Sequence, residues 1–301
     1  MKTPRDPAVP LGTMLTAMAT AFRDDGSLDL ESTQRIATHL VANGNDGLVV
    51  SGTTGESATT TKEEDGEILL AVREAVGPDV VLVAGVGTND TNTSKFLARQ
   101  ARERGADGVL LVTPYYNKPG PRGILHHFRQ VIDAAELPVM LYDVPSRTGS
   151  QIAMETYEQL TRVEAVVAVK DAVGDMPRAA RLVEQGYAVY SGDDANTLGF
   201  LAHGACGLVS VVGHVAGKEL ASMIETFRGG DHAGALAIFQ RLLPAFEAVM
   251  GVPNYGATTA KASLELLGVL DNRNVRSPLV SLDEDEVEAL RTGLRAADLL
   301  H

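Results

Sequence analysis

The stretch Val166-Val167-Ala168-Val169-Lys170-Asp171 is a short apolar run that ends on an amine and a carboxylate. Short runs rich in Val are typical of strands that are buried on both faces of a parallel sheet. An ammonium group at the mouth of such an apolar layer is poorly solvated, so we expect the pKa of Lys170 to fall. A neutral lysine amine is a nucleophile towards carbonyl carbon, whereas a lysine that extends into water stays charged. Lys170 is therefore a candidate nucleophile at the end of a buried strand.

Similar runs rich in Val and Leu recur along the chain, and longer amphipathic segments separate them. Between them we expect helices, including 28–42 and 91–104, with Phe96 and Leu97 of the second helix facing the core. No dinucleotide fingerprint follows the first strand, and Gly85-Val86-Gly87 lacks the third glycine. Strands that alternate with helices then favour a (β/α)8 barrel, an α/β fold, over a doubly wound sheet. The expected strands are 14–19, 47–51, 80–85, 108–113, 138–143, 166–170, 188–191 and 207–212.

The residues after the last expected strand are too many for one closing helix, so we expect a helical region at the C-terminus. Ser281-Leu282-Asp283-Glu284 resembles a capping box that opens the final helix. The expected organisation is an N-terminal extension over 1–11, a barrel over 12–229 and a helical region over 230–301. After the eighth strand, helices are expected at 218–227, 232–250, 258–267 and 284–299.

Composition limits the possible partners and location. The chain has 301 residues and a net charge of -13, which argues against nucleic acid or an anionic membrane as a partner. Cys206 is the only cysteine, so no intrachain disulfide forms and a cytoplasmic location is expected. The first ten residues lack the apolar core of a secretory signal, and no long uncharged apolar stretch predicts a membrane span.

Polar residues gather where the expected strands end, which is where barrels of this kind carry their chemistry. The segment 51–57 offers two glycines, two threonine hydroxyls and free N–H groups that suit a carboxylate. Tyr142 is placed to exchange protons with an amine, and Arg147 offers a planar fork for a carboxylate. The segment 51–57 has an ordinary alternative as a solvated turn that caps the following helix, and Arg147 has one as a surface ion pair. Together they fit Schiff-base chemistry on an α-keto acid.

Five segments lie at or just after the ends of expected strands, in this order: GTTGES at 52–57, TPYYNKP at 113–119, YDVPSRTG at 142–149, VKDA at 169–172 and SGDDA at 191–195. In combination and order they resemble the dihydrodipicolinate synthase family. The resemblance covers nearly the whole chain and implies a (β/α)8 barrel with a C-terminal helical region, usually assembled as a homotetramer of two tight dimers. It also implies that pyruvate condenses with L-aspartate 4-semialdehyde to 4-hydroxy-tetrahydrodipicolinate, in lysine and diaminopimelate biosynthesis, without a metal or nucleotide cofactor.

The resemblance also implies a role for each site residue. Lys170 matches the lysine that forms an imine with pyruvate, and Tyr142 matches the residue that moves protons during that step. Thr54 matches the hydrogen-bonded neighbour of that tyrosine, and Tyr116 matches a tyrosine supplied by the adjacent subunit. The remaining matches bind substrate: Thr53 and Thr54 the pyruvate carboxylate, Arg147 the semialdehyde carboxylate, and Gly192 and Val209 the pocket wall through their backbone.

Two departures from the family pattern bear on the expectations. Ala21 stands before Phe22 where the family usually has proline, which we expect to alter a turn and leave the site intact. Lysine-inhibited members carry histidines and a glutamate where this chain has Lys62, Asp65 and Thr93. We therefore predict weak or absent inhibition by lysine.

Three alternatives stay open on the sequence. A sibling aldolase that acts on a keto-deoxy sugar acid or on 4-hydroxy-2-oxoglutarate would keep the same lysine and tyrosine. A metal-dependent enzyme would have to use His126, His127, His203 or His214 with Asp193 and Asp194, although no metal-binding spacing such as HExxH occurs. A catalytically silent barrel that binds a keto acid is the third alternative.

Overall fold

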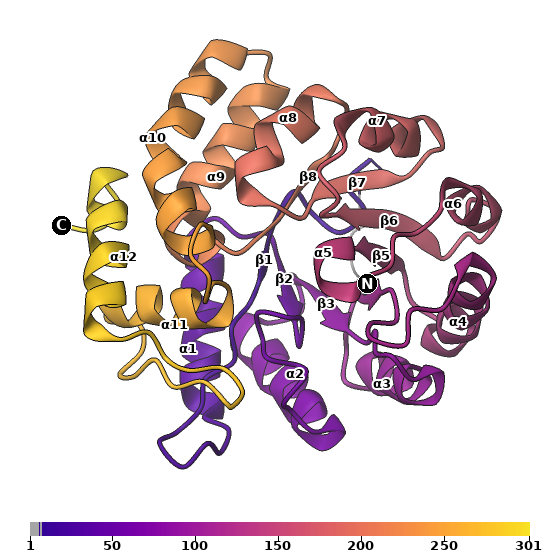
Figure 1. The fold of residues 1–301 in the computed structure, drawn as a ribbon, viewed down its shortest axis with the longest axis horizontal. Coiled ribbons are helices and arrows are strands. Elements are labelled where there is room, and N and C mark those ends of the chain that lie inside the picture. Colours follow the sequence, from indigo (N-terminus) through magenta and orange to yellow (C-terminus); the bar gives the residue numbers. More distant parts are fainter. Residues whose placement is uncertain (1–5, 7) are drawn as a thin grey trace.

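The computed structural model describes residue 6 and residues 8–301. Eight parallel strands, each hydrogen-bonded to its neighbours in chain order, close into one barrel (Figure 1). The (β/α)8 fold expected from the sequence is confirmed, and the strands start and end within two residues of the expected positions. They are β1 Met14–Ala17, β2 Gly47–Val50, β3 Val81–Gly85, β4 Gly108–Val112, β5 Val139–Asp143, β6 Val166–Asp171, β7 Ala188–Ser191 and β8 Gly207–Ser210.

Helices cover the outside of the barrel, and several begin at an aspartate or threonine that caps them. Asp29, Thr61, Asp90 and Asp175 each accept a hydrogen bond from a backbone N–H in the first turn of the helix that follows. The helices are α1 Leu30–Ala42, α2 Lys62–Val76, α3 Thr91–Glu103, α4 Pro121–Ala135, α5 Pro145–Thr148, α6 Met154–Leu160, α7 Met176–Glu184 and α8 Thr197–Ala202, with a 3-10 turn η1 at Asp194–Asn196.

One expectation about helix α3 is wrong. Leu97 is buried, but the side chain of Phe96 is 41% exposed instead of facing the core. The two residues are adjacent, so a helix turns them about 100° apart, and Ser94, Leu97, Ala98 and Ala101 form the buried stripe. Phe96 instead lies beneath the ammonium group of Lys62, whose Nζ is 5.4 Å from the ring centre.

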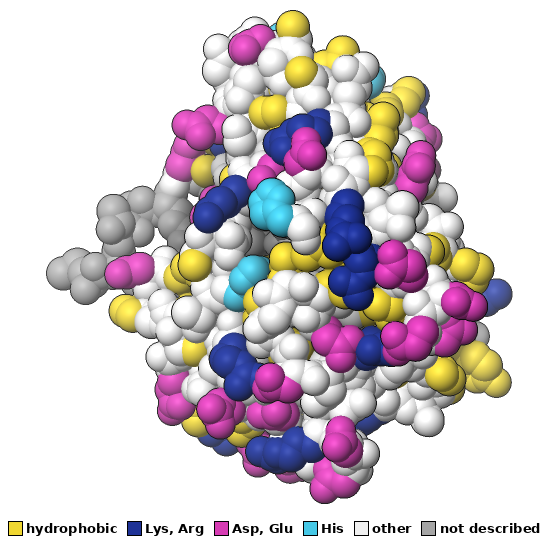
Figure 2. All heavy atoms as spheres, turned by 90° about the vertical axis from the view of Figure 1, so that its left-hand side faces the viewer, with side chains coloured by type: hydrophobic (Ala, Val, Ile, Leu, Met, Phe, Trp, Pro, Cys, Tyr) yellow, Lys and Arg dark blue, Asp and Glu magenta, His cyan; other side chains and the backbone are white. Residues whose placement is uncertain are grey.

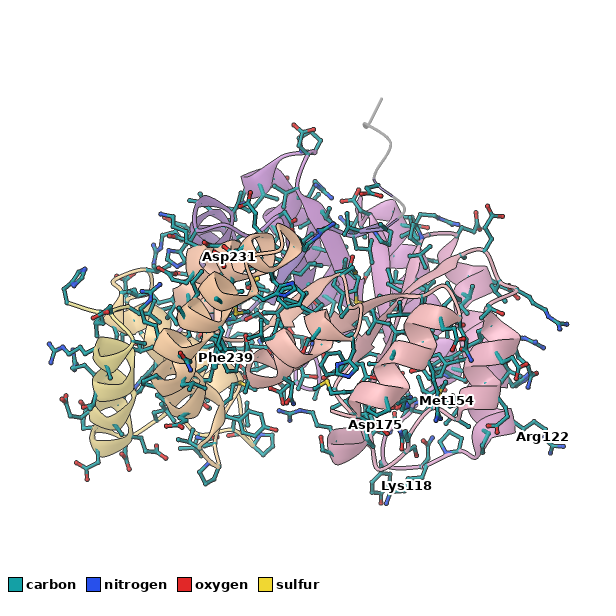
Figure 3. All side chains as sticks on the ribbon, turned by 90° about the horizontal axis from the view of Figure 1, so that it is seen from above. Lys118, Arg122, Met154, Asp175, Asp231 and Phe239 are labelled. Atoms are coloured by element: carbon teal, nitrogen blue, oxygen red, sulfur yellow. The ribbon has the colours of Figure 1, made fainter. Side chains whose placement is uncertain are left out.

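The strands separate two hydrophobic cores. Alternate residues point into the barrel, where Leu15, Val49, Val83 and Met140 pack together, and the others pack against the surrounding helices. Figure 3 shows the barrel from the side, with Lys118, Met154 and Asp175 at the edge where strands lead into their helices. The carboxyl ends of the strands open at this edge, so the site is expected there.

The C-terminal part of the chain is helical, as expected, and consists of α9 Gly213–Arg228, α10 His232–Met250, α11 Ala257–Leu266 and α12 Glu284–Ala296. The capping box of α12 lies two residues later than the sequence suggested. Asp283 accepts from the N–H of Glu286, and the Glu286 carboxylate accepts from the N–H of Asp283. One hydrophobic core spans the barrel helices and this region. The domain boundary between residues 229 and 230 therefore stays a prediction. The expected N-terminal extension, residues 1–11, lies partly outside the described residues.

Helix α10 is long and apolar enough to cross a membrane, which the sequence analysis did not anticipate. It packs against α9 and α12, and Ala235, Leu242 and Ala245 are fully buried in the protein core. Its outer side leaves Leu236 and Leu243 partly exposed. On the face formed by this part of the molecule, acidic and basic side chains are interspersed with apolar ones (Figure 2). Packing within the fold thus explains part of the apolar character of α10, since 28% of this apolar stretch is buried.

Candidate active site

Lys170 lies inside the barrel at the end of β6, and its side chain is almost completely buried. The strand register pairs it with Tyr142 on β5 and with Tyr190 on β7. Its Nζ lies 4.4 Å from the centre of the Tyr142 ring. Burial lowers the pKa of Lys170 to about 8, although the charge of Asp194 works against this; the charge of Arg147 adds to the lowering. A substantial fraction of the amine is therefore neutral near pH 8.

The same environment shifts the pKa of Tyr142 in the opposite direction. Burial raises the pKa of its phenol to about 12, and the charge of Arg147 opposes the rise. The phenol thus keeps its proton at neutral pH and is available as a donor beside the amine.

A cavity of about 190 Å³ opens above the Lys170 amine. This volume is below the roughly 300–1,000 Å³ of sites for drug-sized ligands, so a small acid suits it. Six of the eight residues predicted for the site line the cavity, namely Thr53, Thr54, Tyr142, Arg147, Lys170 and Gly192. A second cavity of about 240 Å³ adjoins it and shares Thr53, Tyr142 and Arg147 as lining residues.

Two predicted residues lie elsewhere. Val209 is buried in the core inside the barrel, and the cavity wall is formed two residues later by Val211. Tyr116 lies on the loop after β4 with a φ of 69°, and its side chain is 89% exposed. Within one chain Tyr116 therefore does not reach the cavity, and the role that the resemblance implies for it depends on a second copy.

The two threonines differ in their surroundings. Thr54 is buried, whereas Thr53 is exposed to the cavity mouth. Left-handed φ angles at Ser51 (54°) and Glu56 (57°) bend the backbone on both sides of them. Residues other than glycine rarely adopt such angles, so the surrounding contacts must hold this loop in place.

Sequence reasoning missed the contribution of the C-terminal region to the cavity. Tyr255, Gly256 and Ala257, at the start of α11, line its wall. The Arg147 guanidinium stacks over the Tyr255 ring, with Cζ 5.0 Å from the ring centre. A glycine before a helix is the only local signal of this contact, and it does not indicate which distant strand the turn will face.

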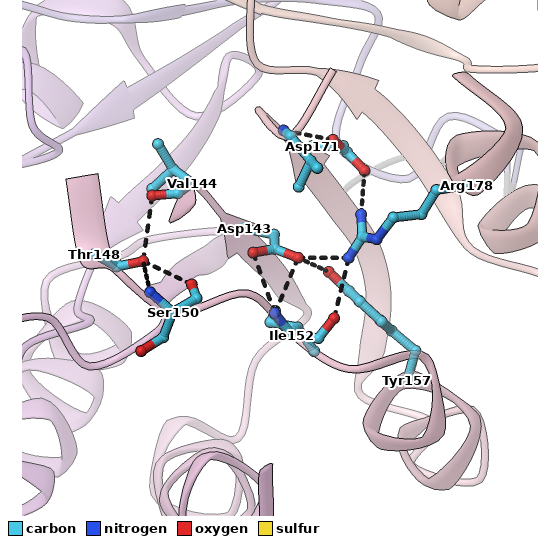
Figure 4. A network of polar contacts seen from close by, with 9 residues as sticks. Asp143, Val144, Thr148, Ser150, Ile152, Tyr157, Asp171 and Arg178 are labelled. Carbon is cyan, nitrogen blue, oxygen red and sulfur yellow. Dashed lines mark hydrogen bonds and ion pairs between the residues drawn. The ribbon is translucent and has the colours of Figure 1, made fainter. Parts of the chain in front are cut away.

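Behind the site, a buried ion network holds β5 and β6 together (Figure 4). The strand register pairs Tyr142 with Lys170, and it pairs the residues that follow them, Asp143 and Asp171, with each other. Successive side chains of a strand point to opposite faces, so the two aspartates lie outside the barrel wall. Arg178 of α7 donates to both carboxylates, over 2.5 Å to Asp143 and 2.6 Å to Asp171. This network fixes the strand ends that carry the amine and the phenol.

Two residues of the metal alternative, His214 and Asp194, have structural partners. The Nε2 atom of His214 accepts from the N–H of Ala19 over 3.0 Å, and burial lowers the pKa of His214 to about 4. Asp194 accepts hydrogen bonds from the Ser210 hydroxyl and from the N–H of Val211. Across residue 6 and residues 8–301, no three His, Cys, Asp or Glu side chains are grouped as metal ligands would be.

Comparison with known proteins agrees with this geometry. The model of the Dihydrodipicolinate synthetase family matches residues 10–297. A 4-hydroxy-tetrahydrodipicolinate synthase of Kineococcus radiotolerans is 50% identical over 298 residues, which cover 99% of this chain and 96% of the relative.

Solved structures of the same family are also similar to this chain. The dihydrodipicolinate synthase DapA-2 of Bacillus anthracis superimposes with a TM-score of 0.91 at 39% identity and covers 95% of this chain and 98% of its own. The enzyme of Cyanidioschyzon merolae, solved with lysine bound, gives a TM-score of 0.92 at 38% identity over 96% of this chain and 99% of its own. Fold, motifs and full-length similarity together place this chain in the dihydrodipicolinate synthetase family.

Proposed function

We infer that this chain is a lyase that condenses pyruvate with L-aspartate 4-semialdehyde to 4-hydroxy-tetrahydrodipicolinate, a step of lysine and diaminopimelate biosynthesis. Curated relatives with this activity match at about 50% identity over nearly the whole chain. The alternative of a sibling aldolase for sugar acids or 4-hydroxy-2-oxoglutarate is not favoured by these relatives. The observation that supports this function most directly is the buried Lys170 amine, which lines a small cavity of mixed polar and apolar character.

Lys170 is the nucleophile in the first half of the reaction. Its neutral amine attacks the keto carbon of pyruvate, water leaves, and an iminium forms. Loss of a methyl proton then gives an enamine. Thr53 and Thr54 supply hydroxyl and N–H donors for the pyruvate carboxylate at the cavity wall. Tyr142 moves protons to and from the departing oxygen, with Thr54 and the partner subunit's Tyr116 completing the relay.

The second half depends on the aldehyde. The enamine carbon attacks the aldehyde carbon of the semialdehyde, and the amino group of the adduct then displaces Lys170 as the ring closes. Arg147 binds the semialdehyde carboxylate, since its guanidinium lines the cavity and lies over the Tyr255 ring. Gly192 leaves room beside the amine, because a Cβ there would lie 3.2 Å from Cε of Lys170. Val209 would support the wall from beneath.

The test has two arms. Borohydride reduction in the presence of pyruvate should add the mass of the reduced adduct to the peptide that bears Lys170. A comparison of aldehyde co-substrates should give the highest kcat/KM for aspartate semialdehyde. Absence of labelling at Lys170 refutes the imine, and a preference for a sugar-derived aldehyde refutes the assigned substrate.

Assembly, cofactor and location are further parts of the proposal. The exposure of Tyr116 supports a homo-oligomer, for which we propose a homotetramer built from two tight dimers, to be measured by analytical ultracentrifugation. The imine chemistry calls for no metal, so activity should survive chelation with EDTA. A cytoplasmic location follows from the biosynthetic role and can be checked by fractionation.

A further inference from the structure

A buried ion pair joins the loop that carries Thr53 and Thr54 to helix α11. The Nζ of Lys261 donates to Oε1 of Glu56 over 2.5 Å and to the carbonyl of Asn274 over 2.6 Å. Both charged side chains are only 1% exposed. The Lys261 ammonium also lies 4.2 Å from the centre of the Phe22 ring. The reaction described above makes no use of this second buried lysine.

The Glu56 carboxylate is bound on both oxygens by the C-terminal region. Its Oε2 accepts from the backbone N–H of Arg276 over 2.8 Å. The Arg276 guanidinium in turn donates to both oxygens of Glu64, over 2.6 and 2.7 Å, and lies 4.3 Å from the Phe22 ring centre. Segments far apart in the chain therefore converge on one loop carboxylate.

Stability alone does not account for a buried pair of this kind. Removing two charges from water costs several kcal/mol each, and apolar side chains of similar volume often hold a core equally well. What this pair provides is a short, directional contact that ties one loop carboxylate to one position on α11.

The pair is close to the cavity along both segments. Glu56 follows Thr54 by two residues and adopts the left-handed φ of 57° that turns the loop. On α11, Ala257 lines the cavity and Lys261 follows one helical turn later, so both lie on the same side of the helix. Figure 1 shows α11 on the barrel side of α12. One helix thus touches the cavity directly and holds the threonine loop through Glu56.

We propose that Lys261 and Glu56 are positioning residues that set the keto-acid-binding loop, so that the C-terminal helical region controls affinity for pyruvate. The proposal rests on the proposed function of Thr53 and Thr54. Loss of the pair should displace the two threonines by up to about 1 Å. A displacement of this size can lower the rate of reaction in a well-oriented site by about 10²-fold.

The variants Glu56→Gln and Lys261→Met test the proposal in the full-length enzyme. We expect the pyruvate concentration for half-maximal borohydride trapping at Lys170 to rise at least about tenfold in each, with a smaller change in kcat at saturating pyruvate. The double variant, in which neither partner is left charged and unpaired, should recover part of the loss. The variant Lys261→Arg keeps the positive charge, so its half-maximal pyruvate concentration should rise less than that of Lys261→Met.

The control is the exposed pair Arg35 and Asp271, which also joins the barrel to the C-terminal region, over 2.7 Å. Arg35→Met should leave pyruvate trapping unchanged within about twofold. Unchanged trapping in both test variants, or a failure of both to fold, would overturn the proposal, because the pair would then serve the fold alone. Failure of the imine step on which the proposal rests is distinguishable, since it would abolish trapping in the unmodified enzyme.

Discussion

Lys170 and Lys261 are the two lysines that are buried in the described part of the chain, and they show how one residue type serves two purposes. Burial lowers the pKa of each to about 8, and each ammonium lies over an aromatic ring. Lys261 also has a carboxylate at 2.5 Å, whereas Lys170 forms no ion pair with any described residue. Burial lowers the pKa and so increases the fraction of neutral amine. Because Lys170 has no described carboxylate in an ion pair with it, its amine is free to react.

The largest effect is expected at Lys170. Lys170→Ala should lower kcat by about 10⁴-fold or more, because no other described amine faces the cavity. Steady-state assays with pyruvate and aspartate semialdehyde measure this. Lys261→Met should retain measurable turnover at saturating pyruvate. Full activity of the Lys170→Ala protein would end the interpretation of the site.

The next effect concerns the phenol beside the amine. Tyr142→Phe keeps the ring beneath Lys170 and removes the proton donor, so kcat should fall by about 10²-fold. Tyr190→Phe is the matched control, because the Tyr190 hydroxyl donates to the carbonyl of Gly12, away from the cavity lining. Equal losses in the two variants would show that the Tyr142 hydroxyl has no special role.

A smaller effect should separate the two substrates. Arg147→Lys removes the planar fork but keeps the charge, so the KM for aspartate semialdehyde should rise by about 10–100-fold. Trapping of pyruvate by Lys170 should stay unchanged, because Arg147 takes no part in imine formation. A parallel loss of pyruvate trapping would place Arg147 in the keto-acid site instead.

The pH dependence of trapping sharpens the comparison of the two lysines. Because burial lowers the pKa of Lys170 from 10.5 to about 8, the neutral amine becomes the major form as pH rises through 8. The initial rate of imine formation should rise through that pH and level off above it. Peptide mapping should find no adduct on Lys261 at any of these pH values, because it is enclosed by Glu56 and Asn274.

The smallest effect is expected from L-lysine. Asp65 is held by the Thr60 hydroxyl over 2.8 Å, and burial raises its pKa to about 6, while Lys62 lies against Phe96. Side chains engaged in this way are poor receptors for a cationic amino acid. Titration with L-lysine in the steady-state assay should therefore reduce the rate little, and half-inhibition at sub-millimolar lysine would contradict this.

Much of the fold was predictable because its signals are local. Each strand is a contiguous apolar run such as Val166–Val169, and its end can be read where polar residues begin. The errors arose where a pattern fits two neighbouring positions. Phe96 and Leu97 both suit a helix face, and Ser281 and Asp283 both suit a helix cap, so only packing decides between them.

The site was predictable to the same extent and for the same reason. Lys170 and Tyr142 each end an apolar run, so the barrel topology brings them together. Tyr255 and Lys261 carry no such mark, and 205 residues separate Lys261 from Glu56. No local pattern connects them, because their contact is created only when the C-terminal helices pack on the barrel.

The ladder between β5 and β6 has a consequence for how such an enzyme could diversify. Tyr142 and Lys170 are neighbours in register, and Arg178 clamps the residues that follow them, so their spacing is inherited from the sheet. Arg147, in contrast, lies in the short helix α5, and Tyr255 lies in the connection between α10 and α11, so both are outside the strands. Evolution could therefore exchange the aldehyde while leaving the amine chemistry intact, which makes this barrel a promising scaffold for new carbon–carbon bond formation.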